Sequence, residues 1–585
     1  MDWTNSFDQK EINEFSNNVT NYFLDELTNL KLSHHSELNL SRKEIELIYR
    51  WSLSLAISTF TERLLRTICN NKQFQKINLT KDKLIIKRYA CIIEATINYY
   101  NNEELNRHLI EKLQSVIFNS GINQNIENIF YKLNIYNKEK NKIKLINKKF
   151  TDAKTFLVFY LKYFFKKLIL LFYKPNYLYD STKQLDLIFP HYAKFLNYPF
   201  FYVHNIDEVS RSKIRNIAEK IFKNKYSKIL KDDDGFKEKS ISKLFAYWIE
   251  SSIPFSLLET LKNRYYYYQK FIKLIKIKHF HASTGFTHNE NIKIFSVLAK
   301  RKNIKIIDHD HGVNNFITPG KNDFISSYKG FEALLFSDVY LSWGKFISDK
   351  HKNVNKLNVE VKEIGSVYLN SLKLNNEAKK IKNGFLIFYC ASQFRKYMSN
   401  LEEITPEKNY IHKKNTASFL KKIININSHI KIIYKPFPEN TKNKSSDPIY
   451  EKLSNEINLK KIEITNEEST KIMKKVDLVI FDLISTGFVE AFNIGKPSIV
   501  FSNKFENSRA SEKGKQINDI LHKNGIIFYN DKEGINTVKR VLSNYNKFQE
   551  DTKDCIDIFK KNLGYPITKN KFLEQLKLLN LISNE

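Results

Sequence analysis

Near position 485 the chain has three residues that can bind an anion, and a carboxylate follows them. Residues 478–481 are all apolar, which predicts a strand buried on both faces of a parallel sheet. The next helix should then begin at Ser485, Thr486 and Gly487, whose hydroxyls and backbone N–H groups can hold a phosphate. Glu490 lies one turn later on the same face, where its carboxylate can accept hydrogen bonds from ribose hydroxyls. Plain helix capping, with Glu490 as a solvated acid, explains the same residues equally well.

Histidines and carboxylates gather at the ends of two predicted strands in the first half of the chain, at 278–282 and 304–307. They are His281, His288 and Glu290 for the first strand, and Asp310 and His311 for the second. Histidine titrates near neutrality and a carboxylate can orient it, so we expect acid–base work from Asp310 with His311 or from Glu290 with His288. Glu290 also fits a capping box with Thr287. No further histidine or cysteine cluster completes a metal site, and we expect none.

Polar residues also follow two predicted strands of the second half, at 384–390 and 429–434. They are Ser392, Gln393, Arg395, Lys435 and Pro436. Ligands bind beyond the carboxyl ends of the strands in open parallel sheets, so these residues and those near 485 should face one cleft. The second half would hold a phosphate and nucleotide there. The first half would hold the acceptor, near His281, Gly312 and Asn314.

The elements that must position these residues alternate between strands and helices, which predicts parallel, doubly wound sheets. We expect an α/β protein with two Rossmann-like domains that face a cleft. The expected divisions are a helical N-terminal extension at 1–150, Rossmann-like domains at 151–375 and 376–548, and C-terminal helices that pack back at 549–585. The motifs GxGxxG and GxxxxGKS/T are absent, which disfavours dinucleotide oxidoreductases and P-loop enzymes.

Composition limits the remaining classes of protein. The 585 residues are 42% hydrophobic and 14% aromatic, which excludes wholesale disorder. The sequence has no uncharged apolar run of about 18 residues, so we expect no membrane-spanning helix. The net charge of +32 comes mainly from lysines that are spread rather than clustered, so we expect no nucleic-acid partner. Four scattered cysteines, and a polar N-terminus without a secretory signal, predict a cytoplasmic protein.

Segment 152–180 is apolar and aromatic but is interrupted by lysines. It fits a basic amphipathic helix at a membrane surface. It also fits a core helix whose lysines reach solvent, which is the interpretation that we favour. A diffuse positive charge would suit either an anionic substrate or an anionic membrane.

Several of these motifs together resemble a known family. The matching elements are His311-Gly312 after a strand, then Lys435-Pro436, then Asp482 with Ser485-Thr486 and Glu490. They are similar to motifs of bacterial surface-polysaccharide glycosyltransferases of the GT-B type, which occur in O-antigen and capsule gene clusters. The likeness continues at Asn289-Glu290, Trp343-Gly344 and Ile364-Gly365, and it spans about residues 20–565.

More distantly, Lys435-Pro436 and Ser485-Thr486 resemble the His-Pro and Ser-Ser/Thr elements of CMP-sialic-acid and CMP-octulosonate transferases, which hold the CMP phosphate. CDP-glycerol polymerases are similar there too. Lysine replaces the histidine of the first element, which keeps a cation beside the phosphate. Asp310 stands where many relatives have glutamine, which leaves open the group that transfers the proton.

The resemblance implies a GT-B glycosyltransferase that uses neither a metal nor another cofactor. Its donor would be a CMP-nonulosonate or CMP-octulosonate, and its acceptor a glycan or lipid-linked glycan of a surface polysaccharide. It would work in the cytoplasm, in contact with the cytoplasmic face of the inner membrane or free of it.

The resemblance also implies a role for each group of residues. Lys435 and Arg395 would neutralise the phosphate, which Ser485, Thr486 and Gly487 would bind, and Glu490 would fix the ribose or base. Asp310 with His311, or Glu290 with His288, would serve as base, nucleophile or acid. Two alternatives stay open: a CDP-polyol phosphotransferase with the same phosphate site, and a non-catalytic basic binding protein.

Overall fold

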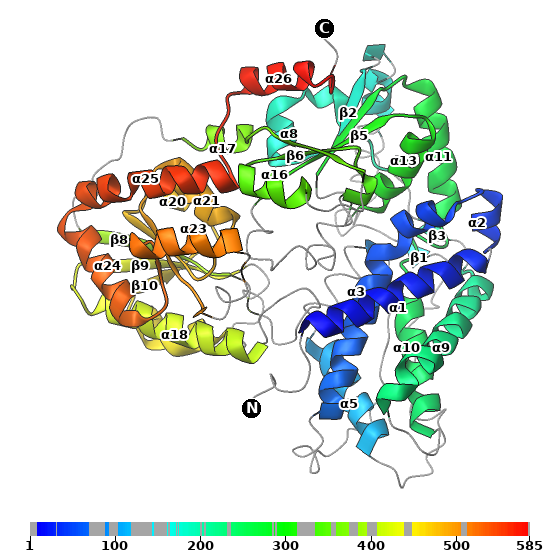
Figure 1. Cartoon of the computed structure of the whole chain (residues 1–585), viewed down its shortest axis with the longest axis horizontal. Coiled ribbons are helices and arrows are strands. Elements are labelled where there is room, and N and C mark those ends of the chain that lie inside the picture. The colour runs from blue at the N-terminus through cyan, green and yellow to red at the C-terminus, as the bar shows by residue number, and fades with distance from the viewer. Residues whose placement is uncertain are drawn as a thin grey trace.

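The computed structural model describes the following residues: 9–30, 32–69, 88–89, 91–92, 103–118, 143–144, 161, 164–170, 172–173, 175–198, 202–203, 206–230, 236–283, 286, 289–312, 334–352, 358–373, 384–392, 394, 406–437, 447–504, 510 and 512–582. Figure 1 shows three parts: N-terminal helices, a first sheet with its helices beside them, and a second sheet domain on the other side.

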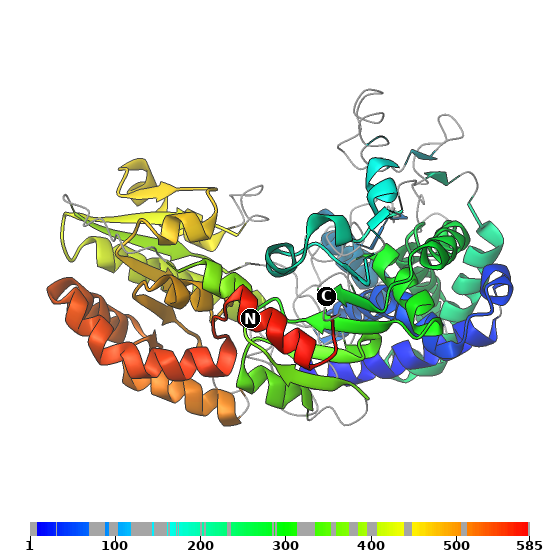
Figure 2. The ribbon, with the colours of Figure 1, turned by 90° about the horizontal axis from the view of Figure 1, so that it is seen from above.

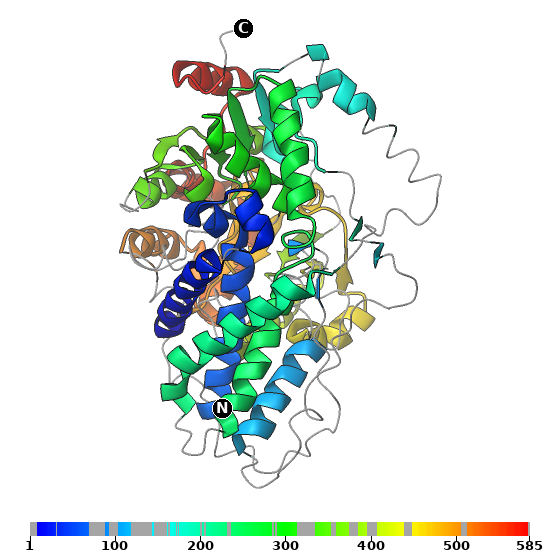
Figure 3. The same cartoon turned by 90° about the vertical axis from the view of Figure 1, so that its right-hand side faces the viewer.

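The N-terminal helices form a bundle that Figure 3 shows from its outer side. They are α1 (Gln9–Asn29), α2 (Ser33–Glu37), α3 (Arg42–Cys69), α5 (Glu103–Phe118), α9 (Glu208–Leu230) and α10 (Phe236–Ser252). Helix α3 begins with a capping box, in which the Ser41 N–H donates to Glu44 Oε2 at 2.8 Å. One hydrophobic cluster joins Trp51 and Trp248 in this bundle to Phe280 in the first sheet. The helical region therefore shares its core with the first domain.

The first sheet is parallel, and its strands follow one another in the order β2-β4-β5-β6-β7. These strands are β2 (Tyr177–Tyr179), β4 (His279–Ala282), β5 (Lys305–His309), β6 (Val339–Ser342) and β7 (Glu360–Glu363). The helices of this domain are α8 (Lys183–Ile188), α11 (Leu261–Leu274), α13 (Glu290–Arg301), α16 (Lys345–Lys352) and α17 (Val367–Ser371). A separate antiparallel pair joins β1 (Ile143–Lys144) to β3 (Tyr202–Val203).

The second sheet is parallel as well, in the order β10-β9-β8-β11-β12-β13. Its strands are β8 (Phe385–Cys390), β9 (Ile430–Lys435), β10 (Ile462–Ile464), β11 (Leu478–Phe481), β12 (Ser498–Phe501) and β13 (Ile527–Phe528). The surrounding helices are α18 (Pro406–Ile424), α19 (Pro448–Asn458), α20 (Ser469–Met473), α21 (Thr486–Ile494), α23 (Glu512–Lys523), α24 (Asp531–Ser543) and α25 (Tyr545–Leu563). Numbered within the domain, this order is 3-2-1-4-5-6, the Rossmann order, and it reverses between β8 and β11.

The expected fold class is confirmed, because the chain forms two Rossmann-like domains of the GT-B type with a helical N-terminal region. Two segments of the chain connect the domains, and their described residues are 364–373 and 564–568. After the second segment, α26 (Lys569–Leu578) covers the first sheet, where Phe572 and Leu576 share a hydrophobic cluster with Ile307 of β5. Figure 2 shows α26 running from the second domain towards the first sheet.

The expected core packing of segment 152–180 holds for only part of its described residues, among them Leu178 and Tyr179 of β2. Leu170 is buried, but Phe172 and Tyr173 are 82% and 67% exposed, and Phe164 and Phe165 are exposed as well. The apolar residues of this segment recur all around the helix, so a single contact with the first domain covers only some of them. Among the described residues, no helix has the length and apolar character needed to cross a membrane.

Candidate functional site

The two domains touch at the residues that sequence analysis placed on opposite sides of a cleft. Gly312 ends the described part of the loop after β5, and Thr486 is the first residue of α21. A Cβ atom built on Gly312 would overlap Thr486 Oγ1, so the backbone of the first domain lies directly against the hydroxyl of the second. Glycine is needed here because any side chain would separate the two loops.

The helix start at 485 lies at the topological switch point of the second sheet. Strands β8 and β11 are neighbours, and the order of the sheet reverses between them. Ser485 is the N-cap residue of α21, but its side chain accepts no capping hydrogen bond from the helix. Capping therefore does not account for the Ser485 hydroxyl.

Asp482 joins the loops that follow β8 and β11. Its Oδ1 accepts a hydrogen bond from the Ser392 N–H at 2.8 Å, and its Oδ2 accepts one from Tyr389 Oη at 2.6 Å. The buried Lys413 of α18 forms an ion pair with Asp482 and also donates to Ser392 Oγ at 2.8 Å. Burial alone would raise the pKa of Asp482, but Lys413, His412 and Tyr389 outweigh it and hold that pKa at about 2. An ionised carboxylate thus fixes both loops.

Glu490 already has a protein partner in this structure. Tyr368, on α17 in the segment between the domains, donates its hydroxyl to Glu490 Oε1 at 2.7 Å. Burial raises the pKa of Glu490, against the effect of the Tyr368 hydrogen bond. Lys183 of the first domain approaches the Tyr368 hydroxyl at 3.4 Å and forms an ion pair with Glu468 of the second at 3.0 Å. The face of α21 that was expected to bind a ribose therefore also contacts the interdomain segment.

Lys435 lies at the end of β9, on the same side of the sheet. Its ammonium group donates to the Glu467 carbonyl oxygen at 2.8 Å, and its charge acts on both Glu490 and Cys390. Pro436 follows it and is buried. The lysine thus brings a positive charge near Glu490 of α21.

On the first domain, Asp310 shapes the loop after β5. Its Oδ1 accepts hydrogen bonds from the N–H groups of His311 (3.0 Å) and Gly312 (3.4 Å), and its Oδ2 accepts one from the Trp343 N–H (3.3 Å). The carboxyl group is 3% exposed, and burial raises its pKa to about 7. His311, by contrast, is exposed. Asp310 therefore holds the loop in shape, and His311 is the member of the pair that reaches solvent.

Glu290 and His281 are both buried. Glu290 begins α13 behind the cap residue Asn289, and its Oε1 has no hydrogen-bond partner among the described residues. His281 Nδ1 lies 2.9 Å from His309 Nε2, and its Nε2 lies 3.2 Å from the Leu581 carbonyl oxygen. Burial holds the pKa of His281 well below its usual value. His281 is therefore a neutral residue of the core in this structure, with no exposed atom to offer to an acceptor.

The described part of the chain does not include four of the predicted site residues, which are His288, Asn314, Gln393 and Arg395. The predicted capping residue Thr287 lies outside it as well. Sequence reasoning missed three residues that the structure adds to the site, namely Lys183, Tyr368 and Lys413. Lys413 lies within α18, far from a strand end, whereas Lys183 and Tyr368 follow shortly after β2 and β7. Only the need of a buried Asp482 for a cation could have pointed to a lysine, without saying which one.

The comparisons with known proteins place the chain in a family of transferases. The model of the LIC12162 family transferases matches residues 2–561. The chain therefore belongs to this family. No curated protein matches the sequence.

Several solved structures are similar at low identity. A UDP-GlcNAc 2-epimerase from Neisseria meningitidis, bound to UDP-GlcNAc, has 13% identity over 55% of this chain and 81% of its own, with a TM-score of 0.36. The enzyme of that name from Methanocaldococcus jannaschii has 13% identity over 55% and 82%, with a TM-score of 0.34. Anabaena Alr3699/HepE, in complex with UDP and glucose, has 11% identity over 56% and 82%, with a TM-score of 0.36.

Proposed function

We propose that this transferase is a glycosyltransferase whose nucleotide-activated donor binds at the start of α21. The supporting observation is the contact of Gly312 with Thr486, because it joins the switch point of the second sheet to the loop that carries His311. Ser485 and Thr486 would bind the phosphate together with the N–H groups of the helix start, and Lys435 would neutralise part of its charge. The acceptor would approach from the side of the first domain.

In the proposed reaction, an acceptor hydroxyl oxygen forms a bond to the anomeric carbon, and the bond from that carbon to the phosphate oxygen breaks. The nucleotide leaves with the bonding electrons. Lys435 and the N–H groups at the start of α21 would stabilise the new negative charge on its phosphate. His311 would take the proton of the acceptor hydroxyl, because it is exposed while the neighbouring Asp310 is enclosed by backbone N–H groups. These groups supply the positive charge that a metal would otherwise bring, so we propose a metal-independent reaction.

The proposed donor is a CMP-activated nonulosonate or octulosonate, and the proposed acceptor is a glycan or lipid-linked glycan of a surface polysaccharide. This assignment is supported by the sequence likeness at Lys435-Pro436 and Ser485-Thr486, whose residues follow β9 and β11, the two strands that flank β8 in the second sheet. Glu490 would bind the ribose after it exchanges its hydrogen bond with Tyr368 for one with the donor.

The test combines binding with product mass. Purified protein is incubated with CMP-, CDP- and UDP-activated donors and a mixture of glycan acceptors. The masses of the products are then measured by mass spectrometry. We expect transfer of a sugar from a CMP-donor, and we expect Ser485→Ala with Lys435→Ala to abolish it. The matched control is Ser454→Ala with Lys431→Ala, because Lys431 is exposed on the same strand as Lys435 and Ser454 is a partly exposed serine within α19. Full turnover in the first double variant would refute the site, and a phosphoryl-polyol product would refute the sugar transfer.

We also propose that the exposed aromatic segment contacts a membrane surface. Phe164, Phe165, Phe172 and Tyr173 are all exposed, and Lys166 and Lys167 lie among them. Aromatic rings insert at the level of lipid headgroups, while lysines are attracted to anionic lipids. A cytoplasmic enzyme that uses a lipid-linked acceptor would gain from such a contact with the inner membrane.

A further inference from the structure

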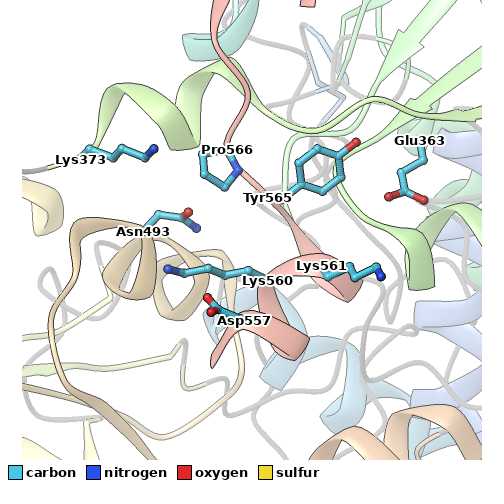
Figure 4. Close-up of a pocket in the computed structure, with 8 residues that line it drawn as sticks. All are labelled: Glu363, Lys373, Asn493, Asp557, Lys560, Lys561, Tyr565 and Pro566. Atoms are coloured by element: carbon cyan, nitrogen blue, oxygen red, sulfur yellow. The ribbon is translucent and has the colours of Figure 1, made fainter. Parts of the chain in front are cut away.

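A pocket of about 520 Å³ lies where the two connecting segments run side by side (Figure 4). The Ser366 N–H donates to the Tyr565 carbonyl oxygen at 2.9 Å, and the Ile567 N–H donates to the Ser366 carbonyl oxygen at 3.2 Å. Gly365 has φ of +82°, and a Cβ atom there would overlap the ring of Tyr565. The pocket therefore sits on a paired, closely packed hinge between the domains.

Three lysines line this pocket: Lys560 and its neighbour Lys561 on α25, and Lys373 from a different part of the chain. Lys373 follows α17 in the first connecting segment, and Lys560 lies near the end of α25 in the second domain. Neither ammonium group forms a hydrogen bond or ion pair with a described residue, although Asp557 lies near enough to act on Lys560. Burial, and to a lesser degree the charge of Lys373, lowers the pKa of Lys560. Two such cations favour an anion between them.

The rest of the lining suits hydroxyl groups. Figure 4 shows Lys373, Asn493 and Lys560 on one side of the pocket and Tyr565 with Glu363 on the other. Carboxylates such as Glu363 accept hydrogen bonds from hydroxyls but repel a second phosphate. The volume is within the range of about 300–1,000 Å³ that is usual for small-molecule sites. The lining thus fits a ligand with one anionic end and several hydroxyls.

We propose that this hinge pocket binds a sugar phosphate, with its phosphate between Lys373 and Lys560 and its hydroxyls towards Tyr565 and Glu363. Asn493, which lines the pocket, is in the last turn of α21, and Thr486, the proposed donor contact, is the first residue of that helix. A ligand that links Lys373 to Lys560 fixes the connecting segment against the second domain. The pocket is separate from the donor site and acts on it by fixing the angle between the domains.

The experiment is isothermal titration calorimetry of the full chain with glucose 1-phosphate, in the presence of saturating CMP and UDP to occupy the donor site. We expect saturable binding of glucose 1-phosphate, no binding of glucose, and weaker binding of inorganic phosphate. Lys373→Met and Lys560→Met should each weaken binding by about tenfold or more, because each removes one charged hydrogen bond. Lys553→Met is the matched control on α25, since Lys553 is exposed and does not line the pocket, and it should bind as the native chain does.

Several results would overturn the proposal. The site is refuted if glucose 1-phosphate does not bind at millimolar concentration, or if both lysine variants bind it normally. Equal affinity for inorganic phosphate would refute the sugar assignment. Loss of binding in the Ser485→Ala, Lys435→Ala variant would show that the ligand occupies the donor site instead. Lys373 is exposed in the connecting segment, so we expect Lys373→Met to fold. This variant therefore tests the proposal even if Lys560→Met fails to fold.

Discussion

Tyr368 donates a hydrogen bond of 2.7 Å to Glu490, and this bond ties the segment between the domains to the helix that begins at the proposed donor site. Glu490 is therefore not a free ligand-binding carboxylate. A donor that takes the place of the tyrosine at Oε1 would couple donor binding to the position of the connecting segment in the proposed enzyme.

The first prediction concerns this hydrogen bond. Tyr368→Phe should lower the free energy of unfolding by about 1–2 kcal/mol, because it removes a hydrogen bond to a partly buried carboxylate. Urea denaturation followed by circular dichroism measures the change. Tyr266→Phe serves as the control, since that side chain is 39% exposed and its loss of a hydroxyl should change the stability by less than about 0.5 kcal/mol. Equal stability of the two variants would contradict the assignment.

The second prediction concerns the contact between Gly312 and Thr486. Gly312→Ala should destabilise the protein by about 1–3 kcal/mol, because the added methyl group overlaps Thr486 Oγ1. Adding Thr486→Ala removes that oxygen, so the double variant should recover much of the loss. A double-mutant cycle in urea measures the coupling. Purely additive effects would mean that the two residues do not touch in solution.

Local patterns were enough to predict the strand at 478–481 and the helix that follows it, because a continuous apolar run and a helix start are set by neighbouring residues. The gathering of polar residues at strand ends followed from the parallel sheets alone. The contact of Gly312 with Thr486 is consistent with that expectation, although the distance between the two loops was not itself predicted.

The residues that hold the site together could not be predicted in this way. Lys413 and Asp482 are 69 residues apart within the second domain, so their pairing depends on how α18 packs against the sheet. Tyr368 and Glu490 are 122 residues apart, and their pairing depends on how the connecting segment packs against the second domain. Strand β2 was missed for another reason: its three residues come directly after a long apolar segment that indicates a single helix. His281 alternates with its neighbours as a strand residue does, but its face of the sheet is covered by α26, which begins 288 residues later.

The third prediction concerns the buried pair of Lys413 and Asp482. Lys413→Met should destabilise the protein by about 3–5 kcal/mol, because it leaves an unpaired carboxylate in the interior. Lys422→Met on the same helix is the control, since Lys422 forms a largely solvent-exposed pair with Asp531 that is worth at most about 1 kcal/mol. Chemical denaturation at neutral pH compares the two. Similar losses would show that Asp482 is not charged or not buried.

The fourth prediction concerns the pH dependence of stability. Burial raises the pKa of Asp310 to about 7, so between about pH 4 and 7 the folded chain keeps a proton that the unfolded chain releases. The unfolding free energy from this residue therefore falls as pH rises through that range, by at most about 1.4 kcal/mol per pH unit. The native chain should lose stability relative to Asp310→Asn over this interval and level off above it. A constant difference from pH 4 to 8 would contradict the raised pKa.

The last prediction concerns the exposed aromatic segment. The native chain should float with vesicles that contain phosphatidylglycerol and should stay in solution with pure phosphatidylcholine, since both rings and lysines contribute. Phe172→Ser with Tyr173→Ser should reduce the floated fraction severalfold. Leu578→Ser is the control because Leu578 is 83% exposed, as much as Phe172, but lies in the C-terminal helix. If the aromatic variant floats like the control, the segment does not contact lipid. High salt should weaken flotation without removing it, because it screens the lysines and leaves the rings unaffected.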